Sequence, residues 1–280
     1  MKSSLLEEVQ EQKESVNVVY DFDSQIYLSA YRFKDTDDTE LIYADCWMRL
    51  KSIESELWKQ YQIDKTIIAL TSKKNYRHDL TKKWKANRKP KPESEMTEKQ
   101  LEAHTATLKL KTLVSATKRL FSERMTKSSN YRVIVNNQLE ADDIFIYLTN
   151  QKGYIGVTID SDCLLQTTSE CFNPSKWEWN KPNSYSDICR HILFTSIQGG
   201  HNSSGLGVKG YGIAKANKFL DSGFTFDDYV NLFETNEDML MNVRVSSCCQ
   251  AISTNKVKLL EVTDIAEMID EVNDMGKDVF

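Results

Sequence analysis

The chain has 280 residues, of which 40% are hydrophobic and only 10 are Gly and 4 Pro, so it is neither a mini-protein nor a low-complexity chain. It contains no run of the ~20 apolar residues that a membrane span needs, and its acid-bearing start lacks the apolar core of a secretory signal. The six cysteines show no CxxC or Cys/His spacing. We therefore expect reduced thiols in a cytoplasmic protein that does not contact a membrane.

The net charge of −5 is unevenly distributed. Residues 73–91 hold nine Lys or Arg and a single acid, Asp79, which leaves 27 basic and 40 acidic residues in the rest of the chain. A basic segment on an acidic body indicates a local contact with a polyanion, although a solvated charged face would have the same composition.

Short apolar runs alternate with stretches of helical periodicity. The runs predict buried strands at residues 17–20, 65–71, 131–135 and 154–160. Helical spacing follows the first run over residues 40–62, and a long helix precedes the third. Strands that alternate with helices favour an α/β fold with an open parallel sheet.

Two regions depart from this alternation. Residues 73–130 form an insertion that carries the basic segment, and after residue 190 a glycine-rich loop leads into a mostly helical region. The last predicted helix is acidic and amphipathic, with Ile265, Met268, Ile269 and Val272 on one face. We expect this face to dock onto the core, and a partner contact is the alternative.

Acidic residues follow three of the predicted strands. These residues are Asp21 and Asp23 after the first, Glu140, Asp142 and Asp143 after the third, and Asp160 and Asp162 after the fourth. The carboxyl ends of parallel strands meet at one edge of a sheet, so all except Asp23 are expected to share one cleft. Such crowding requires bound protons or cations, and an all-oxygen site selects Mg²⁺ or Mn²⁺. For one motif alone, acids that complement a helix dipole are the simpler interpretation.

The basic segment and the glycine-rich loop both have the composition of phosphate-binding sites. Tyr76 and Trp84 are interleaved with cations, as on surfaces that bind single strands. The loop has glycines at 205, 207, 210 and 212 ahead of a helix, where backbone N–H groups can face an anion, and it carries Lys209 and Lys215. The run also fits G-x-G-x-x-G, but the dinucleotide fingerprint needs a strand directly before it. A plain flexible loop is the remaining alternative.

Five motifs in order resemble the flap endonuclease / 5′→3′ exonuclease superfamily, most closely its short phage members. They are "VVYDFD", "NYRHDLTKKWKANRK", "LEADD", "VTIDSD" and "GLGVKGYGIAKA". The resemblance covers roughly residues 16–222. It implies a PIN-like nuclease core over residues 16–190, with residues 73–130 as a helical arch. It also implies a helical DNA-binding region over residues 191–280, with a helix–three-turn–helix motif at about 199–222.

The resemblance further implies hydrolysis of DNA, or of an RNA–DNA hybrid, at 5′ ends, flaps or junctions during DNA replication. The implied metal ligands are Asp21, Glu140, Asp142, Asp143, Asp160 and Asp162, with Asp142, Lys85 and Arg88 as catalytic residues. The implied nucleic-acid contacts are Arg77, Lys82, Lys83, Trp84, Lys85, Arg88, Lys89, Gly207, Lys209, Gly210, Gly212 and Lys215. One Mg²⁺ or Mn²⁺ is expected to bind firmly and a second weakly, and K⁺ is a further expectation at the glycine-rich loop.

Three positions depart from the pattern of the superfamily. Ser72, Gly200 and Ser203 stand where it has aspartates, which weakens the second metal site above all. His201 and Asn202 are poor candidates for substitute ligands. These departures motivate a second hypothesis, in which the chain binds DNA ends and junctions but has lost cleavage. A nucleotide-binding enzyme that uses the glycine run is the third.

Overall fold

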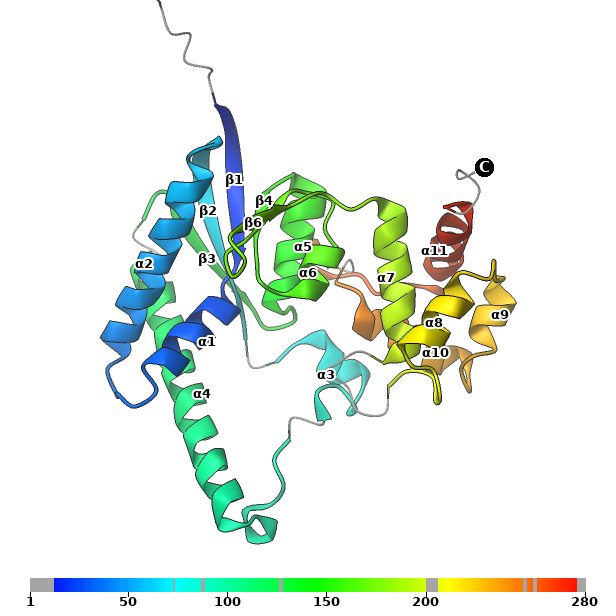
Figure 1. The fold of residues 1–280 in the computed structure, drawn as a ribbon, viewed down its shortest axis with the longest axis horizontal. Helices are drawn as coiled ribbons and strands as arrows, with labels where there is room; N and C mark the ends of the chain where they lie inside the picture. The colour runs from blue at the N-terminus through cyan, green and yellow to red at the C-terminus, as the bar shows by residue number, and fades with distance from the viewer. Residues whose placement is uncertain are drawn as a thin grey trace, which may run out of the picture.

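The computed structural model describes residues 13–72, 74–86, 89–125, 128–199, 206–248, 251–253 and 256–275. Its centre is a six-stranded sheet in the order β3-β2-β1-β4-β5-β6, in which only the β5–β6 pair is antiparallel (Figure 1). The strands are β1 (Glu14–Asp21), β2 (Tyr61–Thr71), β3 (Tyr131–Asn136), β4 (Ile155–Val157), β5 (Cys171–Asn173) and β6 (Glu178–Asn180). The predicted α/β class and parallel sheet are confirmed.

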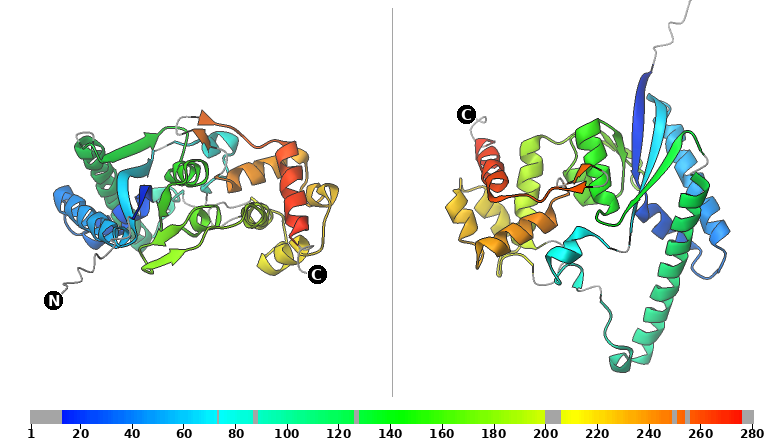
Figure 2. Two further views of the ribbon diagram at one scale, coloured as in Figure 1. Left: turned by 90° about the horizontal axis from the view of Figure 1, so that it is seen from above. Right: turned by 180° about the vertical axis from the view of Figure 1, so that it is seen from behind.

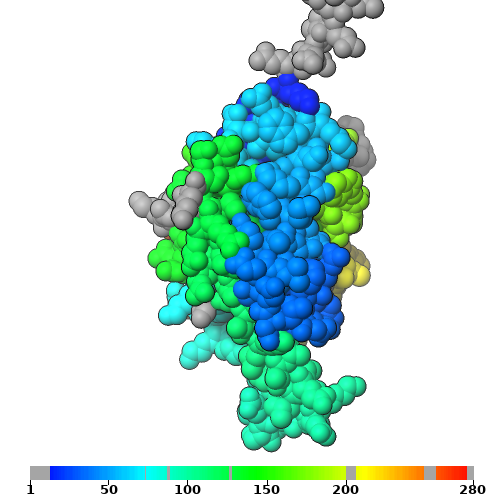
Figure 3. Space-filling model, turned by 90° about the vertical axis from the view of Figure 1, so that its left-hand side faces the viewer, coloured from blue at the N-terminus to red at the C-terminus, as the bar shows by residue number. Residues whose placement is uncertain are grey.

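Alternation along the central strands divides the core into two layers. Val18 and Tyr20 of β1 face one side of the sheet and Val19 faces the other, as the two-residue period of a strand requires. The first side is covered by α1 (Asp23–Arg32), α2 (Thr39–Leu57) and α4 (Glu98–Met125), and the second by α5 (Ala141–Lys152). Figure 3 shows α2 and α4 side by side on the outer face. Both sides of the sheet are thus buried, which explains the continuous apolar runs.

The insertion leaves the sheet after β2 and returns at β3. It contains the short helix α3 (Tyr76–Leu80), a 3₁₀ turn η2 (Glu93–Glu95) and the 28-residue helix α4. The far end of α4 projects well beyond the sheet, with η2 at that end and α3 nearer the middle of the molecule (Figure 2). The long helix expected before the third strand is therefore present.

A second hydrophobic core lies beside the sheet. It is built by α7 (Tyr185–Gln198), α8 (Ile213–Leu220), α9 (Phe226–Val230), α10 (Asn236–Ser246) and α11 (Val262–Asp274). Ile265, Met268, Ile269 and Val272 of α11 are buried in this cluster, so docking of the last helix onto the core is confirmed. The expected domain boundary at residue 190 falls inside α7, whose apolar face belongs to the second core from Ile188 onward.

The remaining elements are small. α6 (Ser161–Leu165) follows β4, and β7 (Ala251–Ser253) pairs with β8 (Lys256–Val257). β4 is shorter than predicted, because the Thr158 hydroxyl accepts a hydrogen bond from Asp160 N–H and turns the chain into α6. In the described part of the chain, no helix is both long and apolar enough to cross a membrane.

Candidate active site

The acids after β1, β3 and β4 meet at one edge of the sheet. β3 lies two strands away from β1, so its acids need a crossing to reach Asp21. The crossing is made by residues 137–140, where Gln138 accepts a backbone hydrogen bond from Tyr76 and Ala141 N–H donates to the Thr71 hydroxyl at 2.8 Å. The start of α5 is thereby held over the end of β2, beside β1.

Asp21 ends β1 with its carboxylate buried. Thr158 Oγ1 donates to it at 3.0 Å and so ties the end of β1 to the turn after β4. Burial, with the charge of Asp23 next in importance, raises the pKa of Asp21 to about 7. Ionisation of such a buried carboxylate is unfavourable, so a nearby cation would stabilise its charged form strongly.

Asp142 lies in the first turn of α5 and faces the same space. Burial and the charge of Asp21, then that of Glu140, raise the pKa of Asp142 well above its ordinary value. In the part of the chain that the structure describes, no side chain or backbone donor bonds its carboxylate. Asp21 and Asp142 are therefore the uncompensated pair of the cluster.

Asp143 is engaged differently, although it is the next residue. Both of its oxygens accept hydrogen bonds from Arg77 at 2.8 Å, and one also accepts the Glu140 backbone N–H at 2.9 Å. Burial raises the pKa of Asp143 and the guanidinium opposes that rise, and the two-armed geometry is that of an ionised pair. Asp143 thus positions the start of α5 and has little capacity left for a metal.

Arg77 is a buried clamp. Its side chain is 2% exposed and also donates to the carbonyl oxygens of Val245 and Ser247 at 3.1 and 3.0 Å. The expectation that Arg77 contacts nucleic acid is wrong for this structure, because its donors are all directed inward. It instead joins α3, α5 and the C-terminal end of α10 with the residue that follows it.

Glu140 pairs with two cations. Lys85 Nζ lies 2.5 Å from one carboxylate oxygen and Arg77 donates to the other at 3.4 Å. Burial alone would raise the pKa of Glu140, but these charges hold it below its ordinary value. Lys85 is the more exposed of the two, at 26%, and adopts a left-handed backbone with φ of 50°. Its ammonium group therefore lies at the mouth of the cluster.

Asp160 and Asp162 complete the pocket on the α6 side. Asp160 begins α6 and accepts the Asp162 backbone N–H at 2.7 Å. Burial raises the pKa of Asp160. The Asp162 side chain is 50% exposed and lies 3.6 Å from His191 Nε2, so it stands at the rim. The pocket is lined by residues of both cores: Arg77, Trp84, Lys85, Glu140, Asp142, Asp160, Asp162, Gln166, Thr195, Gly199, Val245, Ser246 and Cys248.

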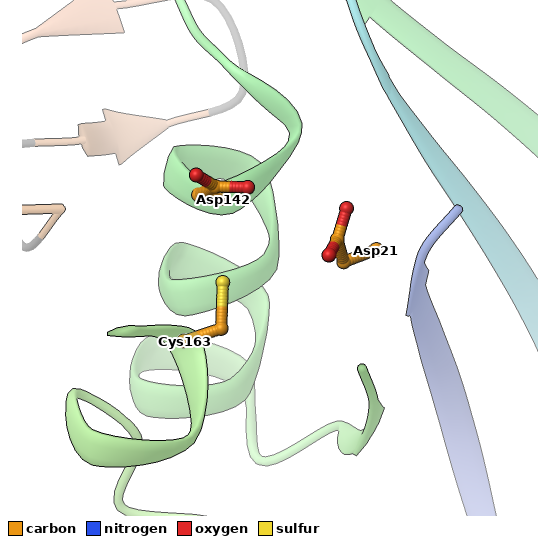
Figure 4. Close-up of side chains that lie close together, drawn as sticks. All are labelled: Asp21, Asp142 and Cys163. Atoms are coloured by element: carbon orange, nitrogen blue, oxygen red, sulfur yellow. The ribbon is translucent and has the colours of Figure 1, made fainter. Parts of the chain in front are cut away.

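The structure adds a sulfur to this site. Cys163 Sγ and one carboxylate oxygen each of Asp21 and Asp142 lie within 4.8 Å of one another (Figure 4). Burial and the charge of Asp142 raise the pKa of the Cys163 thiol well above its ordinary value. Sequence reasoning missed Cys163 because it belongs to no cysteine motif; its place just after "DSD" was the only signal.

Two further departures concern the end of β2. Ser72 donates to the Lys74 carbonyl at 2.7 Å and does not line the acidic pocket. Asp23 is turned away from the pocket, in agreement with the expectation that it does not share the cleft. It accepts the Thr71 N–H and forms a 2.6 Å ion pair with Lys118 of α4.

The basic segment is partly buried. Trp84 is 9% exposed and lies under the charges of Arg77 and Lys85, 5.5 and 4.9 Å from its ring centroid, so it is not open for stacking on a base. Lys82, Lys83 and Lys89 are exposed. Arg88, Gly200, His201, Asn202, Ser203 and Gly205 lie outside the described residues.

The loop after α7 is a tight backbone crossing. Gly199 and Gly207 have φ of 91° and 87°, and a Cβ on Gly207 would lie 2.6 Å from Gly199 Cα. Gly210 and Gly212 lead into α8 with open space around them, and Lys209 and Lys215 are exposed. The loop follows a helix and not a strand, which removes the dinucleotide interpretation.

The fold thus combines a parallel sheet that has a carboxylate pocket at its edge, a long projecting helix and a helical second core. The solved structures with this fold include the bacteriophage T5 5′-exonuclease with bound zinc, at a TM-score of 0.62 and 15% identity over 95% of this chain and 99% of that one. They also include a T5 flap endonuclease in a pseudo-enzyme–product complex with DNA and metal ions, at 0.62 and 15% over 93% and 100%. The resemblance noted in the sequence is thus confirmed in the fold.

A third metal-bound T5 structure gives a TM-score of 0.64 at 14% identity over 95% and 99% of the two chains. No protein-family model and no curated protein matches the chain. The likeness therefore lies in the three-dimensional arrangement, and the chemistry must be argued from the residues of this pocket.

Proposed function

We propose that the protein is a divalent-metal-dependent nuclease that hydrolyses phosphodiester bonds of DNA at 5′ ends or flaps. The observation that carries the proposal is the convergence of acids from three strand ends. Asp142 and Asp160 line one pocket, and carboxylate oxygens of Asp21 and Asp142 lie within 4.8 Å of each other. Within the described residues, neither Asp21 nor Asp142 forms an ion pair with a cation. The structural neighbours, which bind metal ions and in one case DNA, support it.

The residues present fit a divalent ion. Asp21 and Asp142 would hold it, with Asp160 and Glu140 beside them, because burial and mutual repulsion make their paired ionisation unfavourable without a cation. Such an ion supplies activation of water and stabilisation of the attacked phosphate. Asp162, at the rim, suits a second and weaker position.

Lys85 is proposed to act on the substrate. Its ammonium group neutralises Glu140 in this structure and can turn to a phosphate oxygen when a divalent ion takes over that role. Thr158 keeps Asp21 oriented, and Arg77 fixes the start of α5. Arg88 remains a proposed phosphate contact from the sequence alone.

The parts around the pocket suit nucleic acid. We assign residues 73–130 the role of an arch that admits a single strand, with the exposed Lys82, Lys83 and Lys89 facing its phosphates. The helix–three-turn–helix at about 199–222 would hold duplex phosphates through the open backbone at Gly210 and Gly212 and through Lys209 and Lys215. K⁺ at this loop and RNA–DNA hybrids as substrates belong to the same proposal.

A second candidate is a binding module with weakened cleavage. Ser72 bonds its own turn and supplies no carboxylate, and Glu140 and Asp143 are occupied by Lys85 and Arg77. This hypothesis predicts salt-sensitive binding of junctions without product.

Cleavage of a labelled 5′-flap substrate with Mg²⁺ and with Mn²⁺ separates the two candidates. Product that disappears in Asp142→Asn supports the nuclease, and product that survives this change refutes it. Junction binding without product supports the binding module. In that case Gly200→Asp with Ser203→Asp is expected to raise the rate, since it restores two carboxylates to the loop.

A further inference from the structure

One buried group beside Asp21 and Asp142 is not explained by carboxylate chemistry. Cys163 is 0% exposed and comes from α6, whereas Asp21 and Asp142 come from β1 and α5. The three side chains face a common space in Figure 4. Neither the motifs nor the proposed oxygen-ligated site gives the thiol a role.

Cys163 belongs to the buried cluster on the α5 side of the sheet, but packing alone does not explain its charged neighbours. Its thiol has no hydrogen-bond or ion-pair partner within the described ranges, and its nearest charged neighbours are carboxylates. Cys171, a buried member of the same cluster, shows the contrast: its Sγ packs beside Gly156 and the ring of Phe145 and has the Thr167 side chain as a hydrogen-bond partner. A cysteine that serves only as a small apolar residue would be expected in the second setting.

The spacing suits a single ion. Zn²⁺ binds thiolate sulfur at ~2.3 Å and carboxylate oxygen at ~2.0–2.2 Å, so ligands on opposite sides of the ion lie at most about 4.5 Å apart. The three ligand atoms here are already within 4.8 Å of one another. A small side-chain rotation would enclose an ion, and the fourth position would stay open for water or a phosphate oxygen.

We propose that Cys163 is a third ligand of the ion held by Asp21 and Asp142, and that this position prefers a thiophilic divalent ion such as Zn²⁺ or Cd²⁺ over Mg²⁺. The inference rests on the proposed metal site and specifies its ion. When the ion binds, the thiol releases its proton to solvent and the thiolate bonds the ion, with no change in oxidation state. Soft sulfur ligands select Zn²⁺ and disfavour Mg²⁺.

The direct test is a Cd²⁺ titration of the whole protein, followed by the ultraviolet charge-transfer band of a sulfur–cadmium bond. The wild-type protein is expected to develop the band and saturate at one ion per chain. Cys163→Ser should abolish it and weaken Cd²⁺ binding at least ~100-fold, since loss of an outer partner of a ligand alone costs ~10–100-fold. Cys171→Ser is the matched control and should retain the band.

A second measurement does not depend on variant folding. Zinc X-ray absorption of the wild-type protein should show one sulfur at ~2.3 Å together with oxygen ligands. Oxygen-only coordination, or a Cd²⁺ band that survives in Cys163→Ser, would overturn the inference.

Different experimental results would contradict the inference and the proposed function. Flap cleavage with Mg²⁺ but no sulfur–metal bond would remove the thiol ligand and leave the nuclease intact. A sulfur–metal bond that Asp142→Asn weakens, in a protein that cleaves nothing, would uphold the mixed site and refute the nuclease.

Discussion

The carboxylates of the cluster form two pairs, of which only one is neutralised by cations. Asp143 and Glu140 are neutralised by Arg77 and Lys85, whereas Asp21 and Asp142 face each other without a cation. Glu140 and Asp143 therefore hold the chain in place. Asp21 and Asp142 repel each other, and a bound ion would relieve that repulsion. Adjacent acids in the sequence, Asp142 and Asp143, therefore have opposite expected roles.

The largest expected effect is on stability, at the neutralised pair. Arg77→Met would leave buried carboxylates unpaired and should lower the free energy of unfolding by about 3–5 kcal/mol. Urea unfolding followed by circular dichroism measures this change. Lys82→Met, an exposed position in the same basic segment, is the control and should stay within ~0.5 kcal/mol. If Arg77→Met lowers the free energy of unfolding by less than about 1 kcal/mol, the structural role assigned to Arg77 is contradicted.

The next effect is on activity, at the uncompensated pair. Asp142→Asn should lower flap cleavage at least ~100-fold, about 2.7 kcal/mol in transition-state free energy, because it removes an ion ligand. Without divalent ions, the same change should leave the free energy of unfolding unchanged or raise it. The reason is that it removes a buried charge that the neighbouring carboxylates repel. A loss of stability in Asp142→Asn would show that Asp142 supports the fold, as Glu140 and Asp143 do.

The uncompensated pair should also show in the pH dependence of stability. The pKa of Asp21 is raised from 3.8 to about 7 in the folded state, so between these values the native state binds more protons than the unfolded state. Without divalent ions, this group's stability contribution should fall by about 3 kcal/mol as pH rises from ~4 to ~7. Unfolding measured in chelator across this range tests the slope, and Asp21→Asn should flatten it. An unchanged slope in Asp21→Asn would show that other groups cause it.

The smallest effect concerns exposed cations, which have no buried partner. Lys209→Ala with Lys215→Ala should lower duplex affinity and reduce the salt dependence of log K by about 2, roughly one unit for each lost phosphate contact. Fluorescence anisotropy over a salt series provides the measurement. An unaltered slope would remove the glycine-rich loop from the duplex contact.

Much of this arrangement could be predicted because it depends on local patterns. Apolar runs and the acids after them predicted the central strands and the shared edge, since strand ends of a parallel sheet converge. β5 and β6 were missed because three-residue strands leave too short a pattern. Arg77 and Trp84 were assigned to the surface since composition does not tell a buried cation from an exposed one. The burial of Arg77 involves residues 245–248, about 170 positions away along the chain.

The central claim is that acids from distant parts of the chain gather around one divalent ion. A crystal grown with Mn²⁺ and measured for its anomalous scattering tests this claim most directly. The expected result is a peak between the side chains of Asp21 and Asp142 that is absent in Asp142→Asn. A wild-type crystal with no peak there, or with Mn²⁺ bound only elsewhere, would contradict the account.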